Sequence, residues 1–354
     1  MPPLFADDLD HVFAHTRELW EEARGKRFFI TGGTGFFGIW LLETFCHINE
    51  KLDLGMQATV LTRNAKRFAN KCPHLASNSA LRFHGGDARS FPFPDGPFFA
   101  CIHAATEADT QVMASDPLQV FDVNVEGTRR VLEFAHKAGA RRFLFTSSGA
   151  VYGRQPSDLE RIPESYTGGP DPTDTSSAYG IAGEAKRAAE SLCAVYARQL
   201  GVETVIARCF TFVGPHLPLD GKFAIGNFLR DAMRGAPIQV AGDGTPLRSY
   251  LYASDLAIWL WTLLFRGAPG RAYNLGSGEA ISIADLARTV AEAVAPSARV
   301  SIAQPPPAEG IATPPSRYVP DVGRAELDLN LRQTIPLQEA LRRTAAWAAA
   351  ASIH

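Results

Sequence analysis

The chain has 354 residues, 46% of them hydrophobic, enough for one large domain or for a medium domain with a small one. Its 35 basic and 37 acidic residues leave a net charge of −2, which argues against a nucleic-acid-binding protein. Five scattered cysteines with no C-x-x-C pair predict neither a metal centre nor a disulfide framework, and they are typical of reduced thiols in a cytoplasmic protein. The acidic first residues and the lack of an apolar run of ~18 residues predict neither a signal peptide nor a membrane span.

Strand and helix patterns alternate along the first two thirds of the chain. Residues 8–24 have apolar side chains at helical spacing, which predicts an N-terminal helix before the main fold. Strands are predicted at the start of 25–45 and in 56–63, 81–88, 98–106, 141–148 and 202–210, and helices in the rest of 25–45, in 116–138 and in 179–200. This alternation favours a Rossmann-type α/β fold, a doubly wound parallel sheet.

The composition changes after residue 211, where proline and glycine become frequent and the elements become shorter. Helices are predicted in 282–294 and 337–351, and a proline-rich loop in 305–316. We therefore expect a helical extension (1–24), a dinucleotide-binding domain (25–210) and a smaller, mainly substrate-binding lobe (211–354), with the chain free to cross back between the lobes.

Three glycines stand between the first predicted strand and its helix. Gly32, Gly35 and Gly38 form G-x-x-G-x-x-G, in which the first allows a tight turn, the second admits a pyrophosphate and the third lets the helix pack on the strand. The helix start at Phe36 and Phe37 offers free N–H groups and a positive dipole end to phosphates. The alternative is a tight turn in an unrelated α/β protein.

Several later segments match a known family in the right order. They are GGDA at 85–88, HAAT at 103–106, NVEGT at 124–128, SSGAVYG at 147–153, RCFTFVGP at 208–215 and GDGTPLRSYLYASDLA at 242–257. Over residues 25–345 the chain resembles the extended short-chain dehydrogenase/reductases, specifically the NAD-dependent epimerase/dehydratase family that acts on nucleotide sugars. The resemblance implies an NAD(P)-dependent oxidoreductase that acts on a nucleotide-linked sugar, and a homodimer formed through the helices at 116–138 and 179–200.

The resemblance also assigns the cofactor site. Asp87 would hold the adenine, and Ala104 and Ala105 would line the cofactor. The second strand ends at Arg63 and has no carboxylate for the ribose of NAD, so Arg63 either contacts a 2′-phosphate or the adenine, or is a solvent-exposed surface residue. NAD is expected and NADP stays possible. The expected cofactor-binding residues are Gly32, Gly35, Phe36, Phe37, Gly38, Arg63, Asp87, Ala88, Ala104, Ala105 and Lys186.

The resemblance implies a serine, a tyrosine and a lysine as the catalytic group, and these are Ser148, Tyr179 and Lys186. In relatives the lysine follows the tyrosine by four residues, whereas here it follows by seven. In an ideal helix this widens the axial gap from ~6 Å to ~10.5 Å, so contact requires the insertion to bulge or the helix to begin after it. The alternative is that Ala182, four residues before Lys186, occupies the tyrosine position and that the protein has no catalytic tyrosine.

The two residues after Ser148 bear on the reaction. By resemblance, nucleotide-sugar dehydratases carry an Asp-Glu pair there and UDP-glucuronate decarboxylases a Glu, whereas this chain has Gly149 and Ala150. Neither residue transfers a proton, which favours a nucleotide-sugar epimerase. The alternatives are an NADPH-dependent ketosugar reductase and a catalytically impaired relative that binds a dinucleotide.

The substrate residues are also assigned by resemblance. Asn227 and Arg248 would bind the diphosphate, Thr211 replaces an asparagine found in relatives, and Gln239 with Val240 would hold the base, alongside Ser148 at the sugar. The segment at 220–235 is most similar to the UDP-glucuronate decarboxylases, which indicates a pyrimidine nucleotide.

Overall fold

A parallel sheet of seven strands forms the centre of the computed structural model, which describes residues 1–106, 112, 115–175, 177–221, 223–304 and 314–351. Its strands are β1 (Arg27–Thr31), β2 (Gln57–Thr62), β3 (Leu81–Gly85), β4 (Ala100–His103), β5 (Arg142–Ser148), β6 (Glu203–Cys209) and β11 (Arg271–Leu275). The strand order is β11-β6-β5-β4-β1-β2-β3. Successive strands are added on one side of β1 as far as β3 and on its other side from β4 onward, as in doubly wound dinucleotide-binding sheets, and β1 and β4 are parallel. The predicted Rossmann fold is therefore confirmed, and so are its first six strands.

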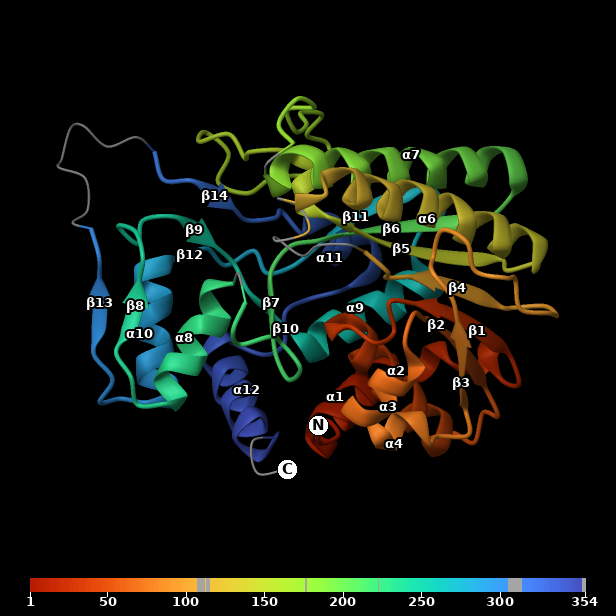
Figure 1. Cartoon of the computed structure of the whole chain (residues 1–354), viewed down its shortest axis with the longest axis horizontal. Coiled ribbons are helices and arrows are strands. Elements are labelled where there is room, and N and C mark those ends of the chain that lie inside the picture. The colour runs from red at the N-terminus through yellow and green to blue at the C-terminus, as the bar shows by residue number, and fades with distance from the viewer. Residues whose placement is uncertain (107–111, 113–114, 176, 222, 305–313, 352–354) are drawn as a thin grey trace.

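Helices cover both faces of this sheet (Figure 1). On one face lie α6 (Pro117–Lys137) and α7 (Gly183–Leu200), and on the other α2 (Phe36–Lys51) and α9 (Ala253–Arg266). Successive side chains of a strand point to opposite faces, so Phe28 and Ile30 enter the core under α2 and α9, whereas Phe29 packs toward α6. Smaller helices, α3 (Ala65–Lys71) and α4 (Pro73–Ala76), connect β2 to β3.

The N-terminal segment departs from the continuous helix expected over 8–24. Helix α1 (Ala6–Thr16) ends at Thr16, and two 3-10 turns follow, η1 (Arg17–Leu19) and η2 (Glu21–Ala23). Trp20 is fully buried, its indole N–H donates to the Thr16 hydroxyl at 3.2 Å, and its ring meets that of Trp261 edge-on at 4.7 Å. Burial of this large ring under α9 outweighs continuation of the helix.

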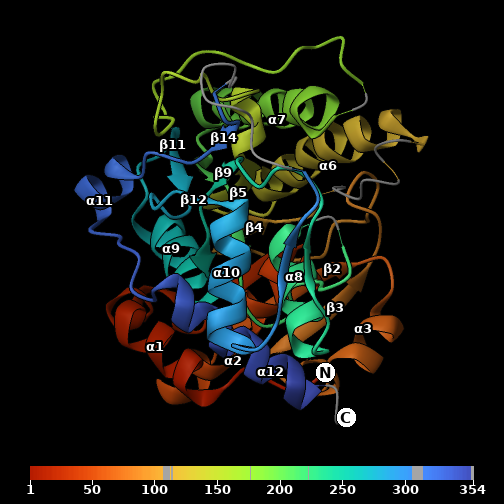
Figure 2. The same cartoon turned by 90° about the vertical axis from the view of Figure 1, so that its left-hand side faces the viewer.

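The chain after residue 211 contributes to both lobes. Strand β11 joins the central sheet beside β6, α9 covers one face of that sheet, and α11 (Gly323–Leu329) packs against β11 and α9. Most of the remaining elements form a smaller lobe (Figure 2). Helices α10 (Ile283–Val294) and α12 (Leu337–Ala351) lie where they were predicted, and most of the proline-rich loop, 305–313, lies outside the described residues. The other elements are β7 (Phe212–Val213), α8 (Ala224–Met233), β8 (Ile238–Val240), β9 (Leu247–Arg248), β10 (Leu251–Tyr252), β12 (Ile281–Ser282), β13 (Val300–Ile302) and β14 (Arg317–Tyr318). In the part of the chain that the structure describes, no helix has the length and apolarity to cross a membrane.

Candidate functional site

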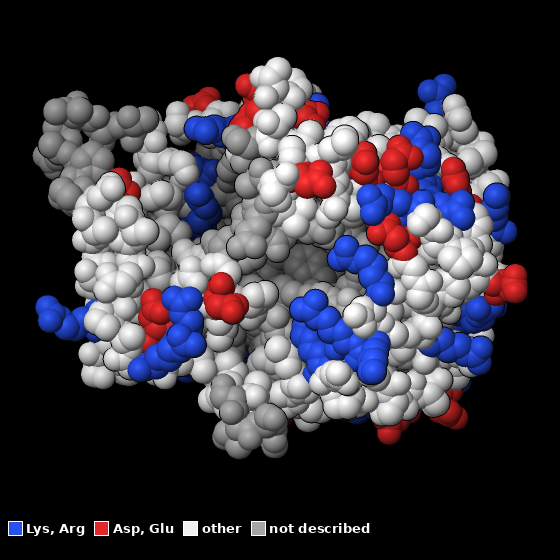
Figure 3. Space-filling model, in the orientation of Figure 1, with Lys and Arg blue, Asp and Glu red and all other residues white. Residues whose placement is uncertain are grey.

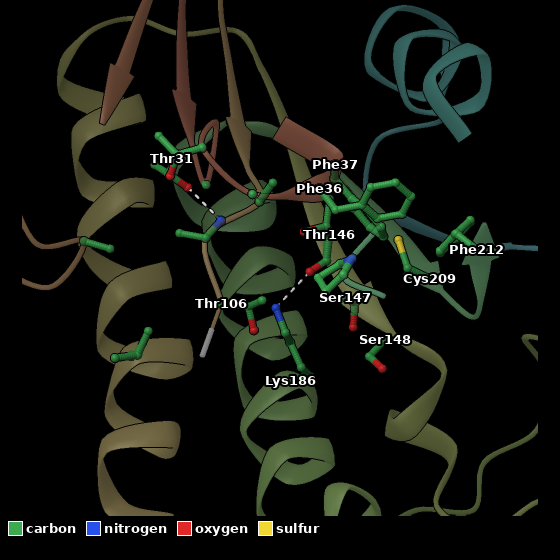
Figure 4. A pocket seen from close by; sticks show the side chains of 18 of the residues that line it. Thr31, Phe36, Phe37, Thr106, Thr146, Ser147, Ser148, Lys186, Cys209 and Phe212 are labelled. Atoms are coloured by element: carbon green, nitrogen blue, oxygen red, sulfur yellow. Dashed lines mark hydrogen bonds between the residues drawn. The ribbon is translucent and has the colours of Figure 1, made fainter. Parts of the chain in front are cut away.

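A cavity of about 560 Å³ opens at the carboxyl ends of the central strands, the edge where ligands bind in doubly wound sheets. It extends from the glycine turn to Ser148 and Lys186, and the C-terminal lobe closes it with Phe212 and Ile225 (Figure 4). The face shown in Figure 3 is hollowed near its middle, with Lys and Arg side chains along part of the rim. The predicted site residues that line the cavity are Gly32, Gly35, Phe36, Phe37, Arg63, Asp87, Ala88, Ala104, Ala105, Ser148, Lys186 and Thr211.

The glycine turn fits a pyrophosphate. Gly32 has a φ of +70°, and a Cβ atom there would lie 2.3 Å from the Ala104 carbonyl carbon. A Cβ at Gly38 would lie 2.2 Å from the Gly32 carbonyl oxygen, so Gly38 serves close packing of helix on strand. Gly35 lines the cavity and caps α2 without a side-chain hydrogen bond, and the first turn of α2 holds no acidic residue. The open N-terminus of α2 therefore faces the cavity as an anion-binding end.

A buried histidine fixes the loop that follows β4. The Thr128 hydroxyl donates to the Asn124 carbonyl at 2.6 Å, so it accepts from His103 Nε2–H at 3.0 Å. His103 Nδ1 then accepts from the Thr31 hydroxyl at 2.7 Å, and the Thr31 oxygen accepts from the Ala105 N–H at 3.1 Å. Burial lowers the pKa of His103 to about 3, which keeps the ring neutral as this chain of bonds requires. Ala104 and Ala105 are thereby held against the cavity.

The far end of the cavity holds charged residues from β2 and β3. Asp87 accepts from Arg89 at 2.9 and 3.1 Å, and this pairing, more than the nearby Arg63, lowers the pKa of the Asp87 carboxyl. Arg63 is exposed, and it lines the cavity directly after β2. The strand tip therefore presents a cation at the place where an NAD-specific site presents a carboxylate.

Lys186 stands in the first turns of α7 with its side chain buried in the cavity wall. Its ammonium donates to the Thr146 carbonyl at 2.9 Å and lies 4.7 Å from the centre of the Phe145 ring. Burial lowers the pKa of Lys186 to about 8. A buried amine with a pKa lowered in this way, in the wall of a cavity, is typical of a functional site.

Ser148 ends β5, and the turn that follows it, η3 (Gly149–Tyr152), is closely covered at its first residue by the side chains of Phe210 and Tyr318. The Ser148 oxygen accepts from the Ala150 N–H at 3.1 Å, so the hydroxyl both caps this turn and faces the cavity. A Cβ atom on Gly149 would lie 2.7 Å from both the Phe210 ring and the Tyr318 hydroxyl oxygen. Ala150 itself is buried.

The insertion between Tyr179 and Lys186 forms a bulge. Residues Ala178–Ala182 make a π-helical turn, η4, in which Gly180 leaves the helical region, and α7 begins after it at Gly183. A Cβ on Gly180 would lie 1.7 Å from the Asp174 carbonyl oxygen, so only glycine fits. Both backbone conditions for contact are thus met, but the side chain of Tyr179 lies outside the described residues, and its pairing with Lys186 stays a prediction.

The remaining substrate candidates lie in the C-terminal lobe. Thr211 lines the cavity and donates its hydroxyl to the Ser249 carbonyl, whereas Asn227, in α8, donates to the Gly221 carbonyl at 3.1 Å and does not line it. Arg248 donates to the Leu247 and Ser316 carbonyls, with no acidic partner in the described residues. Gln239 is exposed and Val240 is buried in β8, and neither lines the cavity.

Sequence reasoning missed other cavity residues. Thr106, Thr146, Ser147, Cys209 and Phe212 also line it. Most stand at or directly after a strand's carboxyl end, which is the signal that locates them once the sheet is known.

A dinucleotide-binding Rossmann protein is the class that this fold and cavity define. Residues 28–276 match the model of the NAD dependent epimerase/dehydratase family. The chain belongs to this family, which confirms the expected resemblance and, at the level of the family, an enzyme that depends on NAD.

Individual relatives narrow the comparison. UDP-glucuronic acid decarboxylase 1 of Arabidopsis thaliana is 32% identical over 90% of this chain and 68% of its own length, and decarboxylase 3 of the same plant is 31% identical over 88% of each. Among solved structures, the UDP-glucose 4-epimerase of Thermotoga maritima with UDP-glucose matches with a TM-score of 0.75 at 20% identity, over 92% and 99% of the two chains. The UDP-glucose 4-epimerase of Thermus thermophilus with NAD matches with a TM-score of 0.72 at 25% identity, over 91% and 98%.

Arg63 should influence which dinucleotide is preferred. Arg63→Asp should raise the ratio of the NADP to the NAD dissociation constant by about tenfold or more, because a carboxylate repels a 2′-phosphate and accepts from a 2′-hydroxyl. The measurement is titration of the full-length variant with each dinucleotide. Arg67→Asp, on α3 and away from the cavity lining, is the matched control. An unchanged ratio would mean that Arg63 is only a surface residue.

Proposed function

We propose that this protein is a nucleotide-sugar epimerase that binds NAD at the glycine turn and a pyrimidine nucleotide sugar between its two lobes. The single observation that carries the proposal is the cavity that joins the N-terminus of α2 to Ser148 and Lys186. Dinucleotide phosphates suit the first end, and an alcohol that loses a hydride and a proton suits the second. The family membership and the nucleotide-sugar ligands named for similar structures support this substrate class.

The proposed roles follow from the placement of the side chains. Bound NAD would supply the acceptor, and later the donor, of a hydride. The Ser148 hydroxyl faces the cavity and would hydrogen-bond the sugar oxygen that becomes a carbonyl. Tyr179, as a phenolate stabilised by the Lys186 ammonium, would take the hydroxyl proton to become the phenol and would later return that proton. Asn227 and Arg248, which do not line the cavity, stay proposals for the diphosphate by resemblance to the family.

The turn after Ser148 favours epimerisation over elimination or decarboxylation. Gly149 and Ala150 have no ionisable group, and a side chain at residue 149 would require the Phe210 and Tyr318 side chains to move. An epimerase needs no further acid there, since moving a hydride out and back requires one acid/base group. This is what distinguishes the proposal from the activity named for the sequence relatives.

UDP-glucuronate decarboxylation is the second candidate, favoured by relatives of 31% and 32% identity along most of the chain. Oxidation next to a carboxylated carbon weakens the bond to the carboxylate by itself, so the missing glutamate would slow that reaction rather than forbid it.

The two candidates are separated by their products. The purified protein is incubated with UDP-glucose, UDP-galactose and UDP-glucuronate, and the products are identified by proton NMR. The proposal predicts that a sugar is converted to its epimer with no loss of carbon dioxide. Formation of a UDP-pentose from UDP-glucuronate, without epimer formation, would establish the decarboxylase instead.

We also propose a homodimer formed through α6 and α7, which pack side by side on one face of the sheet (Figure 1). Leu118 on α6 is 68% exposed, and Val195 and Leu200 on α7 are 46% and 43% exposed, so these two helices offer apolar side chains to a second copy of the chain.

Light scattering should give twice the chain mass of 38.3 kDa, and Val195→Glu should shift the protein toward the monomer. Leu327→Glu, at an 88% exposed position on α11, should leave the mass unchanged. A monomer mass for the unaltered protein at micromolar concentration would rule the dimer out.

A further inference from the structure

A buried ion pair lies behind the cavity, between α7 and the strands β5 and β6. Arg208 on β6 donates to Oε1 of Glu190 on α7 from Nε at 3.0 Å and to Oε2 from Nη2 at 2.7 Å. Ser147, the residue before Ser148, donates its hydroxyl to the same carboxylate at 2.6 Å. Glu190 and Ser147 are both buried. The carboxylate therefore holds the end of β5, β6 and α7 together.

This contact stands in register with the contact that Lys186 makes. Glu190 follows Lys186 by four residues on α7, so the two side chains share one face of the helix. Their partners, Ser147 and the Thr146 carbonyl, are adjacent on β5. Lys186 and Glu190, one helical turn apart, therefore contact two neighbouring residues of β5, and we call this pair of contacts the clasp. The clasp follows the bulge at Gly180 along the chain.

We propose that Glu190 is the positioning residue for Lys186: through Ser147 and Arg208 it fixes the register of α7 against β5, and it places a carboxylate one helical turn from the lysine. The inference rests on the proposed role of Lys186 in catalysis and adds a residue that the motif comparison does not include.

The charges around Lys186 single out Glu190. Apart from burial, the groups that act on the lysine are Cys209 on β6 and Cys193 and Glu190 on α7. Burial raises the pKa of Cys209 to about 12 and that of Cys193 still further, so both thiols are uncharged near neutral pH. His103 on β4 is neutral as well, because burial holds its pKa near 3. Glu190, charged in its pair with Arg208, is left as the group that opposes the effect of burial on the lysine.

Loss of the Glu190 carboxylate should lower the pKa of Lys186. Burial already lowers the pKa of Lys186 to about 8, and removal of the Glu190 charge lowers it further. Arg208 would then keep the Tyr152 hydroxyl as an acceptor but would have no carboxylate partner, so its positive charge would act in the same direction. Glu190→Gln keeps an oxygen that accepts from Ser147, so the variant changes the charge more than the contact.

The test measures the amine itself. Full-length protein as purified is treated with acetic anhydride over a range of pH, and the rate of Lys186 acetylation is followed by mass spectrometry of its peptide. Glu190→Gln should move the midpoint of this rate to lower pH by about one unit, because the neutral amine is the reactive form. Glu184→Gln is the matched control, since Glu184 lies on the same helix, pairs loosely with Arg187 at 3.9 Å and does not contact Ser147; its midpoint should not move.

Two results decide the inference. An unchanged midpoint in Glu190→Gln would overturn it, whatever reaction the protein catalyses, because the readout needs no turnover. A failure to find epimerase activity together with a shifted midpoint would overturn the proposed function alone. If Glu190→Gln does not fold, Glu190→Asp decides: its carboxylate is withdrawn by one methylene, so the midpoint should shift in the same direction by a smaller amount, and no shift would overturn the inference.

Discussion

Replacing Gly35 by leucine should abolish NAD binding while the protein stays folded. Gly35 has an extended backbone that any residue adopts, and a Cβ there would meet only the Gly32 carbonyl oxygen at an ordinary 3.5 Å. The rest of the side chain would enter the cavity at the N-terminus of α2, where the pyrophosphate is expected. We expect NAD to bind at least about 100-fold more weakly, a loss of roughly 2.7 kcal/mol or more, measured by calorimetric titration.

The control is a second glycine of the same turn. Gly38→Ala would force its methyl group to 2.2 Å from the Gly32 carbonyl oxygen and 2.3 Å from the Gly33 Cα, both backbone atoms. This variant should lose about 1–3 kcal/mol of folding stability or more. Thermal unfolding separates the two effects, since Gly35→Leu should melt close to the unaltered protein. Unchanged NAD affinity in Gly35→Leu would refute the assigned cofactor site.

Tyr179→Phe should lower kcat by about 10²–10⁴-fold with little change in NAD affinity, because it removes the acid/base hydroxyl and keeps the ring. The bulge at Gly180 and the helix start at Gly183 provide the backbone conditions under which a tyrosine seven residues before Lys186 comes near the lysine. Turnover of the nucleotide sugar and NAD titration measure the two effects separately.

A second variant tests the alternative position. Ala182 has a helical backbone and precedes Lys186 by four residues, which is the spacing that relatives use. We therefore expect Ala182→Tyr, added to Tyr179→Phe, to restore part of the activity, because it places a tyrosine hydroxyl at the four-residue spacing from Lys186. Full activity in Tyr179→Phe alone would mean that the tyrosine assignment is wrong and that another group moves the proton.

Most of the nucleotide-binding half could be predicted from sequence because its signals are local. Apart from β3, the strands β1 to β6 are mostly apolar runs bounded by polar turns, and the spacing of the three glycines identifies the glycine turn. Strand β11 was missed because Arg271–Leu275 is short and has an exposed start. It becomes a strand by pairing with β6, a contact between residues far apart in the chain. The break in the N-terminal helix likewise depends on the burial of Trp20 under α9.

The site was predictable only in part for the same reason. The sequence motifs identified Ser148 and Lys186, and the structure shows that both line one cavity. The shape of η4 could not be predicted, because it depends on the Asp174 carbonyl packed against Gly180. The side chains that lie close to Gly149 are those of Phe210 and Tyr318, which come from other parts of the chain. The clasp of Glu190 also comes from tertiary packing, because its partners stand on two different strands.

The proposal that this protein epimerises a nucleotide sugar with bound NAD is tested most directly by the spectrum of the purified protein during one turnover. The protein is mixed with a UDP-sugar in a stopped-flow instrument without added cofactor, and the near-ultraviolet absorbance of reduced nicotinamide is followed. We expect denaturation to release NAD from the purified protein, and the absorbance of the reduced form to rise on mixing and then fall as the product epimer appears. A protein that releases no dinucleotide and shows no such absorbance with any UDP-sugar would contradict it.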